Sequence, residues 1–155
     1  MRITKYGLMI EQQQYILVKE STANYAVDAL DTAAKICQMF NALYKLNQLA
    51  EEYVYMVALT CKGKVLGVFE VSHGTGNSSF LRPREVFMRL LLAGASAFVV
   101  IHNHPSGDCT PSKEDINITR LLKETGNMMG IPLIDHIITS DSDHYSFYKN
   151  GFLDD

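Results

Sequence analysis

Apolar residues recur every three or four positions in three parts of the chain, as they do along one face of an amphipathic helix. The first part covers residues 28–51 and predicts a long helix. A second helix is expected from Pro83, which suits the first turn of a helix, to Gly94, which suits its end. A third is expected to begin at Ser112 and to end at Gly130.

Between these helices the pattern changes to short alternating or continuous apolar runs, which are typical of strands. Residues 95–101 form an almost uninterrupted apolar run, as expected of a central strand that is buried on both faces. Because strands and helices alternate, the pattern predicts a mixed α/β sandwich. The other extended segments are residues 2–19 (one or two short strands), 53–60 and 65–71 (a hairpin with its turn at 61–64), and 133–139 and 145–152 (a closing hairpin).

Composition and charge narrow the class of protein. The 155 residues are 47% hydrophobic and 20% charged, which fits a soluble globular domain with a core of its own. The net charge of -3 gives no bulk attraction to nucleic acid or to an anionic membrane. We expect neither a membrane span nor a signal peptide, because the longest apolar stretch, residues 90–101, is too short to span a bilayer and the first residues lack the pattern of a signal peptide. Three scattered cysteines form no disulfide framework, so we expect a reduced, cytoplasmic compartment.

The residues with the most chemistry follow the expected central strand. His102 and His104 are two positions apart near the end of this strand, so both imidazoles face the same side and can share one ion. Asp115, in the first turn of the next helix, can add a carboxylate. Two histidines and one carboxylate suit zinc and leave its fourth position to water, as in catalytic sites.

Structural interpretations of the same residues carry similar weight on spacing alone. Ser112 and Asp115 have the spacing of a capping box, in which both side chains bind free backbone N–H groups. A His-x-His pair at the end of a strand is often structural or exposed. A hydrolytic metal site also needs a base, and spacing does not decide between the four acidic candidates. These are Glu51, Glu52, Glu70 and Glu85, of which Glu52 stands where the first helix gives way to a strand.

The string His102-x-His104-Pro105, six residues, Ser112-x-x-Asp115 matches the motif of the JAMM (MPN+/JAB) metalloproteases. Together with Pro83-Arg-Glu-Val-Phe and Leu133-Ile-Asp-His-Ile-Ile, it resembles the bacterial RadC family over roughly residues 50–152. The resemblance implies a cytidine-deaminase-like JAB/MPN domain, a three-layer fold with a mixed sheet flanked by helices. Residues 51–155 would form this domain, and residues 1–50 would complete it or extend it.

The resemblance also implies roles for individual residues. A zinc ion would be held by His102, His104 and Asp115. Glu52 is the residue that matches the upstream glutamate of JAMM enzymes, which acts on the attacking water, and Ser112 would help to hold the oxyanion. The function implied is a zinc-dependent metallohydrolase that cleaves amide or isopeptide bonds in a peptide or protein substrate. The substrate itself and the oligomeric state, a homodimer included, stay open.

Several residues near the motif carry secondary expectations. Cys109 departs from the RadC pattern, and we interpret it as a loop residue without catalytic consequence rather than as a redox-sensitive residue or an accessory ligand. His136 is expected to be a hydrogen-bonded core histidine, and Asp135 a carboxylate that orients a metal-binding histidine. The loop His73–Phe80 is a candidate gate over the site.

Two alternatives to the hydrolase come from other classes. One is a DNA-repair-associated accessory protein with a non-hydrolytic metal site, for which Arg82, Arg84 and Arg89 would supply a local basic patch. Direct DNA binding is not expected from the charge, and residues 1–51 show no helix-hairpin-helix module of the kind found in longer RadC proteins. The other is a binding module with a vestigial metal site. A zinc deaminase is excluded, because no Pro-Cys-x-x-Cys pair is present.

Overall fold

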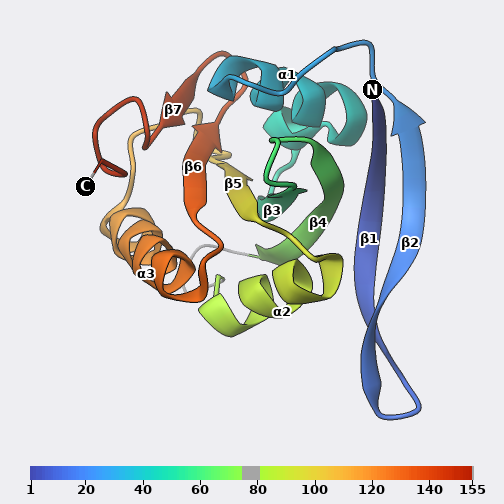
Figure 1. Cartoon of the computed structure of the whole chain (residues 1–155). Coiled ribbons are helices and arrows are strands. Elements are labelled where there is room, and N and C mark those ends of the chain that lie inside the picture. The colour runs from blue at the N-terminus through green and yellow to red at the C-terminus, as the bar shows by residue number, and fades with distance from the viewer. Residues whose placement is uncertain (75–80, 155) are drawn as a thin grey trace.

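The computed structural model describes residues 1–74 and 81–154, and in this part of the chain seven strands form one mixed sheet in the order β2-β1-β4-β3-β5-β6-β7 (Figure 1). Strand β1 runs parallel to β4, and β5 runs parallel to β6, while the other neighbours are antiparallel. The strands are β1 (Arg2–Glu11), β2 (Gln14–Asn24), β3 (Glu52–Leu59), β4 (Val65–Gly74), β5 (Ala97–Asn103), β6 (Leu133–Thr139) and β7 (His144–Ser146).

Helices cover both faces of this sheet (Figure 1). Helix α1 (Ala33–Tyr44) packs on one face, where Phe40 and Met39 are fully buried against alternate residues of the central strands. Helices α2 (Pro83–Ala93) and α3 (Lys113–Met129) pack on the other face around a second core. A short 3-10 helix, η1 (Leu46–Gln48), connects α1 to β3. The predicted three-layer α/β architecture is therefore confirmed.

Local signals place the helix ends. The first helix is shorter than the predicted span of residues 28–51, because Thr32 caps its start and Lys45 adopts a left-handed conformation that ends it. The predictions for α2 and α3 hold: Pro83 is the first residue of α2, and the left-handed glycines that follow the two helices, Gly94 and Gly130, end them.

The central strands follow the pattern closely, and the outer ones differ from it. The hairpin of β3 and β4 forms as predicted, and six of the seven residues of β5 are buried. Residues 2–19 were expected to form one or two short strands, yet β1 and β2 are 10 and 11 residues long. The closing hairpin is shorter than expected, because a bond from the Phe152 amide to the Phe147 carbonyl folds residues 147–152 into a turn.

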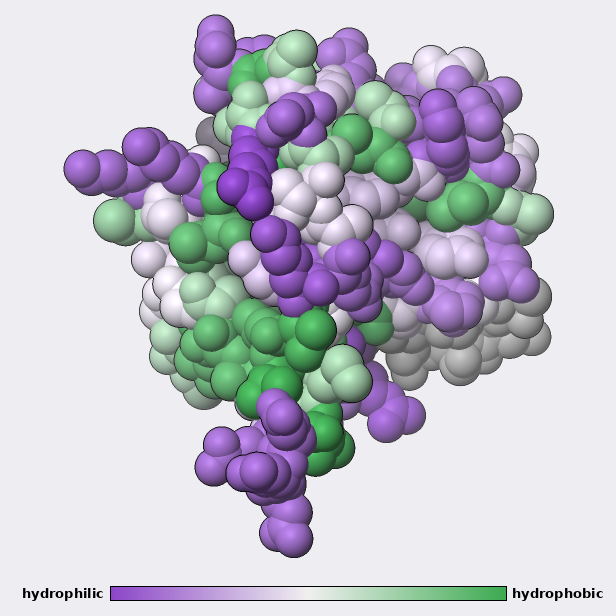
Figure 2. Space-filling model, turned by 90° about the vertical axis from the view of Figure 1, so that its right-hand side faces the viewer, coloured by the Kyte–Doolittle hydropathy of each residue, from purple (hydrophilic) through white to green (hydrophobic). Residues whose placement is uncertain are grey.

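The hairpin of β1 and β2 forms one edge of the sheet. It joins the rest through the pairing of Lys5 with Val68 on β4, so residues 1–50 contribute to the same sheet as residues 51–155. Figure 2 looks onto this side and shows hydrophobic side chains gathered over the hairpin, where Met9, Ile10 and Tyr15 are exposed. No helix in the described part of the chain is long and apolar enough to cross a membrane. Of the candidate gating loop, residues 75–80 lie outside the described residues.

Candidate metal centre

Four side chains that could ligate a metal converge where β5 ends. Glu52 begins β3, His102 belongs to β5, His104 follows that strand directly, and Asp115 lies in the first turn of α3. One ligand atom of each lies within 4.8 Å of the corresponding atoms of the other three. The structure therefore brings together the three predicted metal ligands and the predicted base.

Strand pairing and a helix cap explain this convergence. Val54 on β3 pairs with His102 on β5, so Glu52, two residues earlier, lies on the same face of the sheet. On α3, the Ser112 hydroxyl accepts the amide of Asp115 at 3.0 Å, and the Asp115 carboxylate accepts the Ser112 amide at 2.8 Å. This capping box was the structural interpretation of the pair, and it is present together with the metal-ligand geometry.

The donor atoms have the spacing that a small divalent ion requires. The Nε2 atoms of His102 and His104 are 3.1 Å apart. Oδ1 of Asp115 lies 3.2 Å from Nε2 of His102, and Oδ2 of Asp115 lies 3.4 Å from Nε2 of His104. Ligands that each lie about 2.0–2.1 Å from a tetrahedral zinc ion are about 3.3 Å from one another. The spacing of the three side chains is therefore close to that of ligands around a small metal ion such as zinc.

Hydrogen bonds behind the site fix the orientation of the His102 ring. The Thr119 hydroxyl donates its one hydrogen to the Asp115 carbonyl at 2.6 Å, so it can only accept from Nδ1 of His136, also at 2.6 Å. Nε2 of His136 must then accept from Nδ1 of His102 at 2.8 Å. In its neutral form, His102 therefore carries its proton on Nδ1 and presents the lone pair of Nε2 to the metal centre.

His104 is prepared in the same way by the loop that follows it. Its Nδ1 donates to the Asp108 carbonyl at 2.7 Å, which leaves Nε2 directed at the centre. Burial opposes protonation of His104, but the Asp115 carboxylate and the Asp108 carbonyl outweigh it and raise its pKa. A metal ion would replace the proton that Asp115 attracts to this ring.

The electrostatics of the site favour a cation. Burial alone would raise the pKa of Asp115, but its bonds with His102 and His104 hold the pKa well below its usual range. Burial and the neighbouring His102 lower the pKa of His136, so this ring is neutral. An ionised carboxylate and a neutral supporting ring are the states that metal ligation by this group requires.

The structure separates Glu52 from the other acidic candidates. Its carboxylate lies 3.8 Å from Nε2 of His102, and its side chain is 26% exposed against 11% for Asp115. Glu51 is exposed and lies outside the group. Glu70 is paired with Lys5 at 3.0 Å. Glu85 is engaged with arginines of its own helix, so of the four candidates only Glu52 reaches the centre.

The structure treats the predictions for Ser112, Cys109 and Asp135 differently. The Ser112 hydroxyl donates to the Asp115 carboxylate at 2.7 Å, and its role toward an oxyanion stays a prediction. The thiol of Cys109 is buried and donates to the Asp143 carbonyl, so it lies outside the ligand group, as expected. The expectation for Asp135 is wrong, because its carboxylate accepts bonds from Ser146 and from the Tyr148 amide rather than from a metal-binding histidine.

Sequence analysis did not identify Thr119, which links His136 to the helix that carries Asp115. Its position four residues after Asp115, on the same face of α3, was the available signal. In the basic patch suggested for DNA contact, Arg84 and Arg89 share the one carboxylate of Glu85, which offsets one of the three positive charges of the patch.

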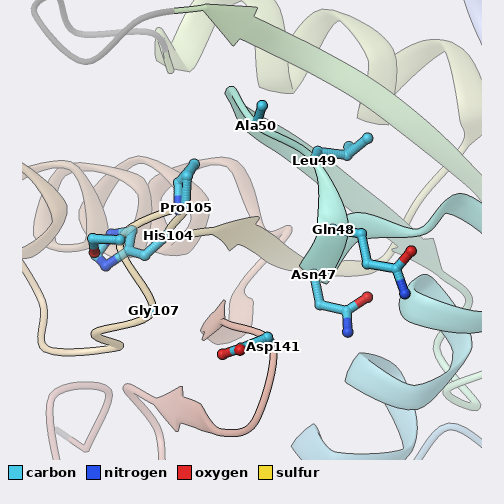
Figure 3. Close-up of a pocket in the computed structure, with 9 residues that line it drawn as sticks. Asn47, Gln48, Leu49, Ala50, His104, Pro105, Gly107 and Asp141 are labelled. Carbon is cyan, nitrogen blue, oxygen red and sulfur yellow. The ribbon is translucent and has the colours of Figure 1, made fainter.

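A groove of about 480 Å³ begins beside the metal centre (Figure 3). His104 and Pro105 line one side, while the connection from η1 to β3 and Asp141 lie across from them. One of the proposed ligands, His104, is therefore part of the groove wall. Its lining residues are Asn47, Gln48, Leu49, Ala50, His104, Pro105, Ser106, Gly107 and Asp141.

The fold and the ligand group define an α/β domain with a candidate metal centre, and comparison with known proteins gives its family. Residues 30–152 match the RadC-like JAB domain, and the chain belongs to this family. It is 41% identical over 128 residues to a UPF0758 protein of Pelobacter propionicus, covering 82% of this chain and 56% of that protein. It is 31% identical over 153 residues to UPF0758 protein TTE0897 of Caldanaerobacter subterraneus subsp. tengcongensis, covering 99% of this chain and 64% of that one. The chain thus spans about half to two thirds of these relatives.

Proposed function

We propose that this domain is a zinc-dependent hydrolase of amide or isopeptide bonds. The observation that carries the proposal is the arrangement of His102, His104 and Asp115 at close to tetrahedral spacing, with a second and more exposed carboxylate, that of Glu52, beside them. A structural zinc site is closed by four tightly held ligands, whereas a catalytic site leaves a position open to solvent. The higher exposure of Glu52 supports a role as base rather than as fourth ligand.

His102, His104 and Asp115 would hold the ion. When bound, zinc activates water and polarises a carbonyl group, which is the chemistry that amide hydrolysis requires. Glu52 would accept the proton of the attacking water and later deliver it to the leaving nitrogen. Asp115 and His104 keep their orientation through the Ser112 cap and the Asp108 carbonyl, so the ligands need little reorganisation.

The groove beside His104 would hold the substrate chain. His104 lines the groove together with Pro105 and residues before β3, so a peptide lying in it would pass beside one of the proposed ligands and could present an amide group to Glu52. Ser112, once its hydroxyl turns away from Asp115, would donate to the oxyanion of the tetrahedral intermediate. A peptide or an isopeptide-linked protein is the class of substrate that we propose.

Metal content and hydrolysis together test the proposal. Protein purified without chelator should contain about one zinc per chain, and the double variant His102→Ala/His104→Ala should contain none. Glu52→Gln should retain zinc but lose hydrolysis of a peptide or isopeptide library by about 100-fold or more. Glu51→Gln is the matched control, because Glu51 precedes Glu52 directly but is exposed and lies outside the ligand group. This variant should retain both zinc and hydrolysis. Absence of zinc from the wild type after reconstitution would exclude the zinc hydrolase.

A further inference from the structure

Asn103 stands between the two histidine ligands, but strand alternation directs its side chain to the opposite face of the sheet. It is 1% exposed, and all of its polar atoms are engaged with backbone groups. Its Oδ1 accepts the Tyr53 amide at 2.7 Å, and its Nδ2 donates to the carbonyls of Glu51 at 2.9 Å and Leu49 at 3.2 Å. The bonded groups of Glu51 and Tyr53 lie directly before and after Glu52.

These bonds continue the connection between β3 and β5 beyond the point where their backbone pairing stops. In the described part of the chain, the last pair of this ladder toward the site is Val54 with His102. Glu52 pairs with Gly74 of β4 on its other side. The amide of Asn103 is therefore what ties the backbone around Glu52 to the strand that carries the histidines.

We propose that Asn103 is a positioning residue, which sets the place of the Glu52 carboxylate relative to the metal ligands. The inference rests on the proposed function in one respect, the role of Glu52 as the base. An amide is well suited to this task, since it offers one acceptor to an N–H and two donors to two carbonyls. A misplacement of a reacting group by 1 Å can cost about 100-fold in rate, so an anchor on both sides of the base has a direct catalytic consequence.

Hydrogen exchange tests the anchor without any need for activity. In Asn103→Ala, the Tyr53 amide should exchange at least about 10-fold faster than in the wild type, because its acceptor is removed. The amides of Met56 and Val57, deeper in β3, should be unchanged. Asn41→Ala is the matched control: the Asn41 side chain also accepts a backbone amide of the same connection, that of Asn47, but does not touch the residues beside Glu52. Unchanged exchange at Tyr53 in Asn103→Ala would overturn the inference.

A double-mutant cycle tests the consequence for catalysis. Asn103→Ala should lower kcat by about 10- to 100-fold with little change in KM, and it should have almost no further effect in a Glu52→Gln background. Asn41→Ala should leave kcat within about 2-fold. An equal loss in both backgrounds would mean that Asn103 acts on the fold in general and not through Glu52, which would overturn the inference.

The two proposals can fail separately. If the wild-type protein hydrolyses no peptide or isopeptide, the proposed function fails. The positioning role of Asn103 can still be tested by hydrogen exchange at Tyr53 and by the visible spectrum of the Co²⁺-loaded protein. Asn103→Ala and Glu52→Gln should then perturb this spectrum in the same way, and the double variant should add nothing. A spectrum that responds to Glu52→Gln but not to Asn103→Ala would overturn the positioning role.

Discussion

His102 and His136 are joined by a hydrogen bond of 2.8 Å between Nδ1 of the first ring and Nε2 of the second. This bond connects a proposed metal ligand to a fully buried ring that is itself held by Thr119. Because Thr119 in turn bonds the backbone of Asp115, two ligands from different elements share one rigid support. The core histidine expected at position 136 is therefore also a partner of the metal centre.

Replacing His136 by Phe should weaken zinc binding by about 10- to 100-fold, because His102 loses the acceptor that fixes its tautomer and its ring orientation. The substituted ring retains the stacking that His136 makes on Phe147, so the fold should persist. Competition with a chromophoric chelator measures the affinity. Asp135→Asn is the control, since this neighbouring carboxylate contacts Ser146 and not the centre. Equal zinc affinity in His136→Phe and wild type would refute the supporting role.

Ser112→Ala should have two linked effects. Loss of the α3 cap should lower the free energy of unfolding by about 1 kcal/mol. Zinc affinity should fall as well, because the Asp115 carboxylate loses its hydroxyl donor at 2.7 Å. Thr32→Ala removes the corresponding cap of α1, far from the centre, and should reduce stability alone. Chemical denaturation and chelator competition separate the effects; a Ser112→Ala protein with unaltered zinc affinity would show that the hydroxyl serves the helix only.

Thiol reactivity should follow burial and pH. Burial raises the pKa of Cys37 to about 12 and also raises the pKa of Cys109, so neither residue forms appreciable thiolate at pH 8. Cys61, in contrast, is exposed to a reagent. A disulfide reagent at pH 8 should modify about one thiol per folded chain, and none in Cys61→Ser. Raising the pH toward 12 should increase the reactivity of Cys37. Rapid modification of all three thiols at pH 8 would contradict the buried placement.

Cys109→Ser should leave the zinc content unchanged, because the thiol donates to the Asp143 carbonyl and lies outside the ligand group. Elemental analysis of the purified variant beside the wild type measures this directly. A loss of zinc would identify Cys109 as an accessory ligand, which is the alternative that the sequence left open.

The sequence predicted the parts of the site that depend on local signals. His102 and His104 follow from strand alternation, and Asp115 from a helix start with strong capping residues. Glu52 could be chosen only through the family resemblance. Its approach to His102 depends on the pairing of β3 with β5, in which Val54 meets a residue 48 positions later in the sequence. Such non-local pairing leaves no periodic pattern around the glutamate.

The remaining differences have similar physical origins. The first helix ends because Lys45 adopts a left-handed conformation, which residues other than glycine rarely do. The spacing of apolar residues gives no sign of this helix end. The Asn103 anchor was missed because a buried polar residue in an apolar strand reveals its partners only when the opposing backbone is in place. Local signals thus predicted the candidate ligands, whereas the residues that support them depend on tertiary contacts.

The groove beside the centre should favour substrates with a basic side chain near the cleaved bond. Asp141 is the one carboxylate among its nine lining residues, and no ion pair within the described residues includes it. A lysine or arginine of the substrate would supply the missing countercharge at the rim, where such a pair is worth up to about 1 kcal/mol. Asp141→Asn should therefore lower kcat/KM for lysine-containing peptides about 3- to 5-fold and leave neutral peptides unaffected.

Asp141→Lys should reverse this preference in favour of acidic peptides, and the wild-type preference should decline with added salt, as expected of an exposed charge pair. Asp28→Asn removes an exposed carboxylate that does not line the groove, and it should leave the ratio of the two kcat/KM values unchanged. Parallel assays of lysine, neutral and glutamate versions of one peptide at low and high salt measure all of these effects. If the ratio is the same for wild type and Asp141→Lys, the substrate does not pass through this groove, and its path to Glu52 lies on another side of the metal centre.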